Sequence, residues 1–256
     1  MASKALHQIN VLRSVATSTL SAWRGTSVVK AANQPKQYLK LYDMEGCPYC
    51  RRVREALTAL GLDAEIYPCP KRGKRFRPEA MRLGGKRQFP LLVDPNTSTT
   101  LYEATDIVDY LFKTYGGRDT PSAYTTGLLR PLLGGMGSLV RGMRGTHVRK
   151  ARHPKKMLAL WSFESSPYSR LVRERLTELE LAYVLHNIGK EQFADMGPAV
   201  RRVRPGPYKP RPGGRREQVL AALGRVQVPY LEDPNTGTQL YESADIIDYL
   251  ERQYAQ

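Results

Sequence analysis

The residues best suited to chemistry are two thiols, Cys47 and Cys50, separated by Pro48 and Tyr49. An apolar run leads into this motif and a helical pattern follows it, which places Cys47 at a strand-to-helix turn. Pro48 falls in the first helical turn, where its missing N–H costs nothing. The free N–H groups and positive dipole end of that helix favour a thiolate over a thiol. A low-pKa cysteine with a second thiol three residues on is typical of disulfide exchange, in which Cys47 attacks and Cys50 resolves.

Arg51 and Arg52 follow the pair, and we expect their charge to favour the thiolate further. Other roles for the two thiols are weaker. A zinc site needs two more ligands at a matching spacing, but only Cys69 and four scattered histidines remain. A structural disulfide would close a very small loop and stabilise little, and the proline between the thiols disfavours an iron–sulfur cluster held at Cys47 across a dimer. We therefore predict thiol chemistry and no metal site.

The chain carries an excess of positive charge, and the places where this charge lies limit the functions that it suggests. The chain has 256 residues, which is enough for two domains. Its three cysteines are too few for a secreted disulfide scaffold and indicate a reducing compartment. Its net charge is +16. Residues 1–36 carry five basic residues and no acid, and residues 117–156 carry nine basic residues and one acid. Most of the excess therefore lies outside the candidate folded units, and no nucleic-acid motif accompanies it, so nucleic-acid binding is not favoured. No apolar run is long enough to span a membrane.

The N-terminal segment 1–36 is rich in Ser, Thr, Ala and basic residues, and the first acid of the chain is Asp43. This composition is typical of an organellar transit peptide. We expect a chloroplast location, with the mitochondrion as the alternative. A disordered tail is the other interpretation of the segment.

From residue 37 the pattern becomes globular. Extended apolar runs predict strands, and 3.6-residue periodicity predicts helices. The order is β-α-β followed by α-β-β-α, with strands at 38–43, 64–67, 88–93 and 99–102 and helices at 49–60, 78–83 and 103–115. In the first helix the apolar face is Val53, Ala56, Leu57 and Leu60, and Gly61 ends the helix.

The second half of the chain repeats the first, with Ser166-Pro167-Tyr168-Ser169 in place of the two-thiol motif. The offset between matching residues grows from 119 to 139, so the second copy carries a twenty-residue insertion within 197–216. We expect this insertion to be a solvent-exposed loop. The matching segments are 47–50 with 166–169, 89–97 with 228–236, and 101–111 with 240–250.

Both copies resemble the thioredoxin-fold N-terminal domain of glutathione transferases, and Cys47-Pro48-Tyr49-Cys50 also resembles the motif of glutaredoxins. The whole arrangement is similar to plant and algal plastid proteins with two tandem domains of this type. The resemblance implies an α/β fold of two tandem thioredoxin-like units, without the helical C-terminal domain of transferases. The implied organisation is a tail at 1–36, a glutaredoxin-like domain at 37–116, a basic linker at 117–156 and a second, redox-inactive domain at 157–256.

The resemblance also implies the residues that contact glutathione. In that family a cis proline and the backbone before it pair with the cysteinyl part, and a Glu-Ser pair that opens the last helix holds the γ-glutamyl carboxylate. The implied contacts are Tyr49, Phe89, Pro90, Glu103 and Ala104 in the first copy and Ser166, Val228, Pro229, Glu242 and Ser243 in the second.

Each copy departs from the family pattern. The first has the thiols but carries Ala104 where the family has serine, and the second has Ser243 but no cysteine. The second copy therefore cannot exchange thiols, although Ser166 is placed to hydrogen-bond a glutathione thiolate, as in serine-type transferases. We interpret Cys69 as a small semi-buried hydrophobe and the basic loop 71–77 as a solvated face that also suits the glycyl carboxylate.

The connector 117–156 has apolar residues at helical spacing with Arg130, Arg141 and Arg144 opposite them. Pro131 and four glycines oppose a helix that is stable alone in water, because each glycine costs roughly 1 kcal/mol. Several interpretations stay open. Residues 127–156 contact a membrane surface peripherally or a partner, or the segment packs across the two domains or stays disordered.

Together these features predict a glutathione-linked thiol–disulfide oxidoreductase that uses Cys47 and Cys50, with glutathione as co-substrate and glutathione or protein disulfides as partners. This function requires a groove of glutathione size beside Cys47. The alternatives are a non-catalytic, membrane-associated interaction or assembly protein with a transferase-type fold, and a glutathione transferase.

Overall fold

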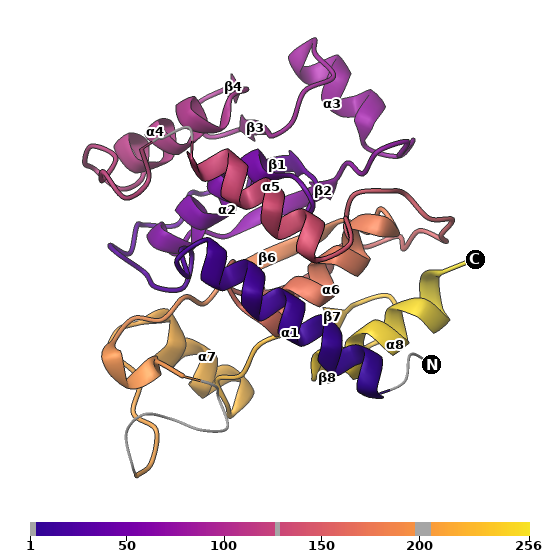
Figure 1. The fold of residues 1–256 in the computed structure, drawn as a ribbon. Helices are drawn as coiled ribbons and strands as arrows, with labels where there is room; N and C mark the ends of the chain where they lie inside the picture. Colours follow the sequence, from indigo (N-terminus) through magenta and orange to yellow (C-terminus); the bar gives the residue numbers. More distant parts are fainter. Residues whose placement is uncertain (1–3, 126–128, 198–205) are drawn as a thin grey trace.

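The computed structural model describes residues 4–125, 129–197 and 206–256. Two similar units follow one another along the chain (Figure 1), each led by a helix, α1 Lys4–Leu20 or α5 Leu129–Val140. The first unit continues with β1 Leu39–Asp43, α2 Pro48–Leu60, β2 Ala64–Pro68, α3 Arg77–Gly84, β3 Leu91–Asp94, β4 Thr99–Leu101 and α4 Ala104–Thr114. The second continues with β5 Leu158–Ser162, α6 Pro167–Glu178, β6 Tyr183–Asn187, the 3₁₀ turn η1 Phe193–Asp195, α7 Arg215–Leu223, β7 Tyr230–Asp233, β8 Thr238–Tyr241 and α8 Ser243–Tyr254.

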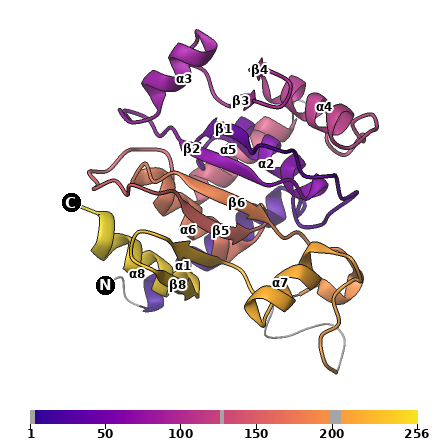
Figure 2. The ribbon, with the colours of Figure 1, turned by 180° about the vertical axis from the view of Figure 1, so that it is seen from behind.

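The two units share one eight-stranded sheet, ordered β4-β3-β1-β2-β6-β5-β7-β8. Within each unit the first two strands are parallel and the last two antiparallel, which is the predicted order. The units join where β2 pairs antiparallel with β6, with Ala64 opposite Leu185 (Figure 2). The predicted class, two tandem thioredoxin-like α/β units, is confirmed. Their fusion into one sheet relates them by an approximate twofold axis between β2 and β6.

The first helix after a strand begins and ends as the residue types predict. Cys47 is the N-cap of α2, Pro48 occupies the first turn, and Gly61 ends the helix with a left-handed φ of 63°. The predicted apolar face is buried and belongs to a core cluster that includes residues of both units. This shared core is formed by α2 and α6 together with the strands beneath them.

The leading helices α1 and α5 lie side by side across the face that α2 and α6 cover (Figure 1). They cross where Thr17 Oγ1 donates to the carbonyl of Gly137 at 3.1 Å. A Cβ on Gly137 would lie 2.8 Å from the methyl of Thr17, so glycine permits this approach. Each helix packs on the other unit: α1 contacts α6, and α5 contacts α2.

The contacts of α1 and α5 repeat each other across the axis. Ser18 Oγ donates to the carbonyl of Ser165 at 2.8 Å, and Ser138 Oγ donates to the carbonyl of Gly46 at 2.9 Å. Each leading helix therefore covers the turn that carries the motif of the opposite unit. These matching contacts show that the N-terminal segment is part of the repeated unit and corresponds to the connector.

These findings bear on the tail and the connector. Residues from Lys4 on are not a disordered tail, because α1 is packed and Val11, Ser14, Thr17 and Ser18 are buried. The connector packs across both units, as one of its interpretations proposed. Arg141, which lies opposite the apolar residues in the sequence pattern, is buried, with its guanidinium 2.6 Å from Glu174. No described helix has the length and apolar character needed to cross a membrane.

A buried cluster of charges lies where the two units meet. Its centre consists of two carboxylates and two guanidinium groups that match at an offset of 119, Glu45 with Glu164 and Arg54 with Arg173. Each arginine bridges both glutamates, at distances of 2.9 to 3.1 Å, and none of the four side chains is more than 2% exposed. Because each of the four central groups contacts two groups of opposite charge, the ion pairing offsets the free-energy cost of removing these groups from water.

Removing one central guanidinium leaves uncompensated carboxylates in the interior. We expect Arg54→Met to lower the free energy of unfolding by about 3–5 kcal/mol, because Asp43, Glu45 and Glu164 all contact that guanidinium. The matched control is Lys113→Met, which breaks an exposed pair with Asp109 and should change stability little. Urea unfolding followed by circular dichroism measures both. Equal stabilities for the two variants would contradict the assigned role of the cluster.

Candidate functional site

Cys47 has the surroundings of an activated thiol. Its sulfur accepts the backbone N–H of Cys50 at 3.4 Å. The pKa of Cys47 is lowered chiefly by a hydrogen bond with the Cys50 thiol and further by the N–H groups of Cys50 and Tyr49, against the opposing effect of burial. Arg54 adds its charge. The fully buried Cys50 has a pKa raised well above the ordinary value, because burial disfavours its thiolate. The two thiols are therefore unequal, as attack by one and resolution by the other require.

The positive charge that acts on this thiol comes from a different residue than expected. Arg51 and Arg52 were expected to favour the thiolate, but Arg51 pairs with Glu55 at 2.9 Å. The guanidinium that contributes most to lowering the pKa of Cys47 is Arg54, from the buried cluster. The cluster thus connects the meeting point of the two units to the reactivity of the sulfur.

The other predicted residues of the first unit lie at the same end of the sheet. Tyr42 of β1 pairs with Leu91 of β3, so the turn after β1 and the cis Phe89–Pro90 bond are neighbours. The expected cis geometry is present there and at Val228–Pro229. Glu103 precedes α4 with a positive φ of 63°, Ala104 begins that helix in a buried position, and Tyr49 is half exposed. The guanidinium of Arg77 lies 4.7 Å from the Phe89 ring centroid.

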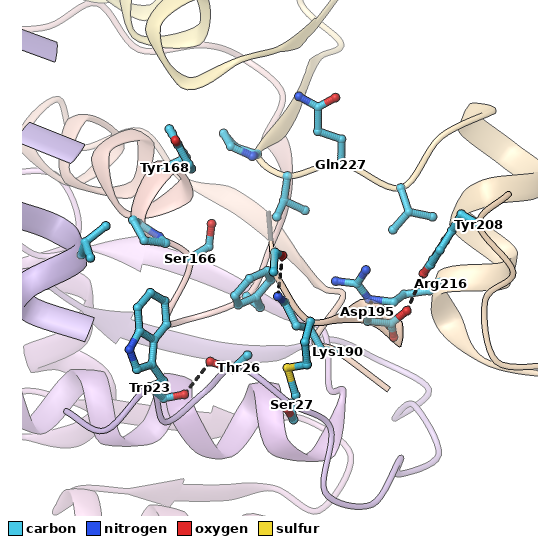
Figure 3. Close-up of a pocket in the computed structure, with 18 of the residues that line it drawn as sticks. Trp23, Thr26, Ser27, Ser166, Tyr168, Lys190, Asp195, Tyr208, Arg216 and Gln227 are labelled. Carbon is cyan, nitrogen blue, oxygen red and sulfur yellow. Dashed lines mark hydrogen bonds and ion pairs between the residues drawn. The ribbon is translucent and has the colours of Figure 1, made fainter. Parts of the chain in front are cut away.

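In the second unit the corresponding residues surround a cavity of about 830 Å³ (Figure 3). Ser166, Val228, Pro229 and Glu242 line it, as their matching positions predict. Ser243, which follows Glu242 in the chain, does not line it and is 2% exposed. This volume is in the upper part of the ~300–1,000 Å³ range of small-molecule sites. Four of the five predicted residues of the second copy therefore line one cavity.

Ser166 is held in a fixed orientation at this cavity. Its hydroxyl oxygen accepts the Ser169 N–H at 3.3 Å and the Ser169 hydroxyl at 2.9 Å. Both donors come from the first turn of α6, which repeats the relation of Cys50 to Cys47. The O–H of Ser166 is left to donate to a ligand, and a thiolate placed there would be a suitable acceptor.

His7 of α1 reaches the place that the resemblance assigns to the γ-glutamyl carboxylate. Its Nε2 lies 3.1 Å from the Ser243 hydroxyl. Burial lowers the pKa of His7, while Asp248, Asp245 and Glu242 act in the opposite direction. A carboxylate bound at Ser243 would therefore meet an imidazole from the leading helix as well.

The insertion was predicted to be an exposed loop, and its described part is more than that. Tyr208 and Arg216 line the cavity, and Tyr208 donates to Asp195 at 2.8 Å. Residues 198–205 of the predicted loop lie outside the described residues. The insertion thus forms one wall of the site in the second unit.

Sequence reasoning missed the residues that the N-terminal segment contributes. Trp23, Thr26 and Ser27 line the cavity beside Lys190. A signal for them exists: Arg24-Gly25-Thr26 matches Arg144-Gly145-Thr146 at an offset of 120. Extending the repeat upstream through these six residues would have joined the segment to the fold.

Two further expectations concern cysteine and metal. Cys69 is fully buried, and burial raises the pKa of its thiol, which suits a small core residue. Within residues 4–125, 129–197 and 206–256, no three His, Cys, Asp or Glu side chains gather as a metal ion would need.

Comparison with protein families supports what the fold and sites indicate. The family model for the glutathione S-transferase N-terminal domain matches residues 41–119 and 160–256, one segment in each unit. The chain therefore belongs to the glutathione S-transferase N-terminal domain family. Neither the search of curated proteins nor the search of solved structures returned a match.

The unequal thiols make a direct prediction. Because its surroundings lower its pKa, Cys47 should react with iodoacetamide at a rate whose half-maximum lies below about pH 8.5, whereas Cys50 and Cys69 should need a higher pH. Mass spectrometry of peptides after brief alkylation measures each site separately. A half-maximum for Cys47 at or above that of Cys69 would contradict the assigned activation.

Proposed function

We propose that this protein is a glutathione-linked thiol–disulfide oxidoreductase with its redox centre at Cys47 and Cys50. The observation that carries the proposal is the placement of the two free thiols at the start of α2. Cys47 is the N-cap, and its sulfur accepts the Cys50 N–H at 3.4 Å, whereas Cys50 is fully buried. This placement lowers the pKa of Cys47 and raises that of Cys50. Membership of the glutathione S-transferase N-terminal domain family supports glutathione as the co-substrate.

In the proposed reaction the Cys47 thiolate attacks one sulfur of a mixed disulfide between glutathione and a protein thiol. The original S–S bond breaks, a Cys47–glutathione disulfide forms, and the protein leaves as a thiolate that takes up a proton. A second glutathione then attacks this disulfide, which releases oxidised glutathione and frees the Cys47 thiolate. If Cys50 attacks Cys47 instead, glutathione leaves and a Cys47–Cys50 disulfide forms, which two further glutathione molecules reduce in successive exchanges. Glutathione supplies the electrons and is oxidised, and the protein substrate is reduced.

Cys47 keeps a small exposed fraction, 7%, at the N-cap of α2. Ser166 at the matching position is 3% exposed and lines the cavity of the second unit, which Cys47 does not line. The groove of glutathione size that this function requires beside Cys47 stays a prediction. A chloroplast or mitochondrial location, and peripheral membrane contact through 127–156, stay predictions from composition.

The oxidoreductase proposal is tested by reduction of a glutathione mixed disulfide, coupled to glutathione reductase. We expect Cys47→Ser to lower the rate at least about 100-fold, because the attacking thiolate is absent. Cys50→Ser should retain activity, since glutathione can resolve the intermediate. Cys69→Ser is the matched control for loss of a buried thiol. Equal rates for the wild type and Cys47→Ser would favour the non-catalytic interaction protein instead.

A transferase activity in the second unit is the second candidate, because Ser166 faces a cavity of suitable size. Conjugation of glutathione to 1-chloro-2,4-dinitrobenzene should then saturate with glutathione. Ser166→Ala should lower kcat/KM by about 10-fold or more, as loss of one donor to a developing thiolate implies. Cys47→Ser should leave this activity unchanged. An unaltered rate in Ser166→Ala would exclude a role for this hydroxyl in conjugation.

A further inference from the structure

The two units differ where a leading helix packs on a motif helix. In the second unit Arg170 of α6 is fully buried, and its guanidinium donates to the carbonyl and the hydroxyl of Ser14 at 2.7 and 3.0 Å. In the first unit Arg51 of α2 matches Arg170 at an offset of 119, and Gly134 of α5 matches Ser14 at an offset of 120. Glycine has no hydroxyl, so the side-chain acceptor that serves Arg170 has no equivalent at Arg51.

A second difference changes the partner of a carboxylate. In the second unit Glu174 pairs with the guanidinium of Arg141 at 2.6 Å. Ser21 stands at the position of Arg141, at an offset of 120, and Glu55 stands at the position of Glu174. Because Ser21 carries no charge, Glu55 pairs with Arg51 instead, at 2.9 Å. The first unit therefore lacks a side chain of arginine size at the end of α1.

A third difference adds a cation. Arg52 replaces the buried Leu171 at an offset of 119, and it is buried as well, with 7% exposure. Among the residues that the structure describes, Nε and Nη2 of Arg52 and Nη2 of Arg51 have no hydrogen-bond partner. Burial lowers the pKa of Arg52, and the charge of Glu55 opposes this effect. Buried guanidinium donors without acceptors are costly, so these groups favour an acceptor that the chain itself does not supply.

The three differences meet in one small pocket between α2, α5 and the end of α1. Three guanidinium groups, one carboxylate and two small residues line it: Arg24, Arg51, Arg52, Glu55, Ser21 and Gly134. A Cβ on Gly134 would lie 2.8 Å from the Cβ of Pro48, so glycine keeps this space open. The volume is about 30 Å³, and one water molecule needs ~10–15 Å³. The pocket thus has room for two oxygen-sized atoms.

The charges that line the pocket select the class of ligand. The carboxylate of Glu55 offsets one of the three guanidinium charges, which leaves two positive charges for a ligand to neutralise. Guanidinium groups bind two oxygens of a carboxylate or phosphate through parallel N–H donors. A carboxylate carries a single charge, whereas phosphate and sulfate carry up to two and have further oxygens that can face solvent. Arg24 and Ser21 are half-buried and mark the open side of the pocket.

We propose that this pocket binds a tetrahedral oxyanion of the phosphate or sulfate class. Two of its oxygens accept from Arg51 and Arg52, and its outer oxygens face Arg24 and solvent. The bound anion would link α1 and α5 to α2, which are neighbours in Figure 1. The proposal involves neither a thiol nor the cavity of the second unit, so its failure would leave the proposed redox function untouched.

The test is the melting temperature of the full-length protein as sodium phosphate replaces the sodium salt of a bulky sulfonate at constant ionic strength. An anion that binds only the folded state raises this temperature as its concentration passes the dissociation constant. Arg52→Leu introduces the residue of the second unit and should weaken phosphate about 10-fold or more, as loss of a charge-assisted hydrogen bond implies. Each variant is compared with its own melting temperature without phosphate, so a loss of stability does not mimic a loss of binding.

Two further variants make the test specific to the pocket. Ser21→Arg places the guanidinium of the second unit in this space and should abolish the saturable effect of phosphate. Arg82→Leu removes an exposed charge from α3 and should leave the affinity for phosphate unchanged. No saturable effect in the parent, or equal affinities for phosphate in the parent, Arg52→Leu and Ser21→Arg, would overturn the proposal.

Other anions identify the ligand. Acetate and chloride should bind at least about 10-fold more weakly than phosphate, because each carries one charge; acetate that binds as tightly as phosphate would contradict a tetrahedral oxyanion. Glycerol 3-phosphate separates two sources of the same chemistry. If it binds as tightly as inorganic phosphate, the site accepts the phosphate group of a larger molecule, and if inorganic phosphate alone binds, the ligand is the free ion. Both results support the pocket as an oxyanion site.

Discussion

The rest of the structure depends on the buried ion pairs that link the two units. Arg54 and Arg173 each hold both Glu45 and Glu164, so neither unit can satisfy its own buried charges alone. Five guanidinium and five carboxylate groups take part when the surrounding pairs are included: Arg51, Arg54, Arg141, Arg170, Arg173, Asp43, Glu45, Glu55, Glu164 and Glu174. The balance of signs permits this burial and requires both motif helices to lie close together.

Around this centre the duplicated units have diverged in what their equivalent turns offer. The first turn carries two thiols whose pKa values are moved in opposite directions, and the second carries two serines beside a large cavity. The leading helices complete both places from across the axis, since α5 covers α2 and α1 covers α6. The two thiols of one unit and the cavity of the other are therefore parts of a single folded body.

Much of this architecture could be predicted, because strand alternation, helix periodicity and the internal repeat are local properties of the sequence. The same holds for the place of the motif residues, since Cys47 and Ser166 begin α2 and α6 as the strand-to-helix pattern predicts. The join between β2 and β6 could not be predicted, since nothing local states which edge strands pair. The role of α1 was missed because its composition matches a targeting segment, and Arg54 was missed because its partners Glu45 and Glu164 lie in different units. The hydrogen bond from Lys190 to the Gly197 carbonyl, at the start of the insertion, could not be predicted either, because it forms only in the folded chain.

The central claim is that each unit is completed by the leading helix of the other, and hydrogen–deuterium exchange of the full chain tests it most directly. We expect amides of α1, Lys4–Leu20, to exchange slowly, with protection close to that of α2 and α6, because opening α1 would expose Val11, Ser14, Thr17 and Ser18. Exchange of the α1 amides at the rate of an unstructured peptide, while α2 and α6 stay protected, would contradict it.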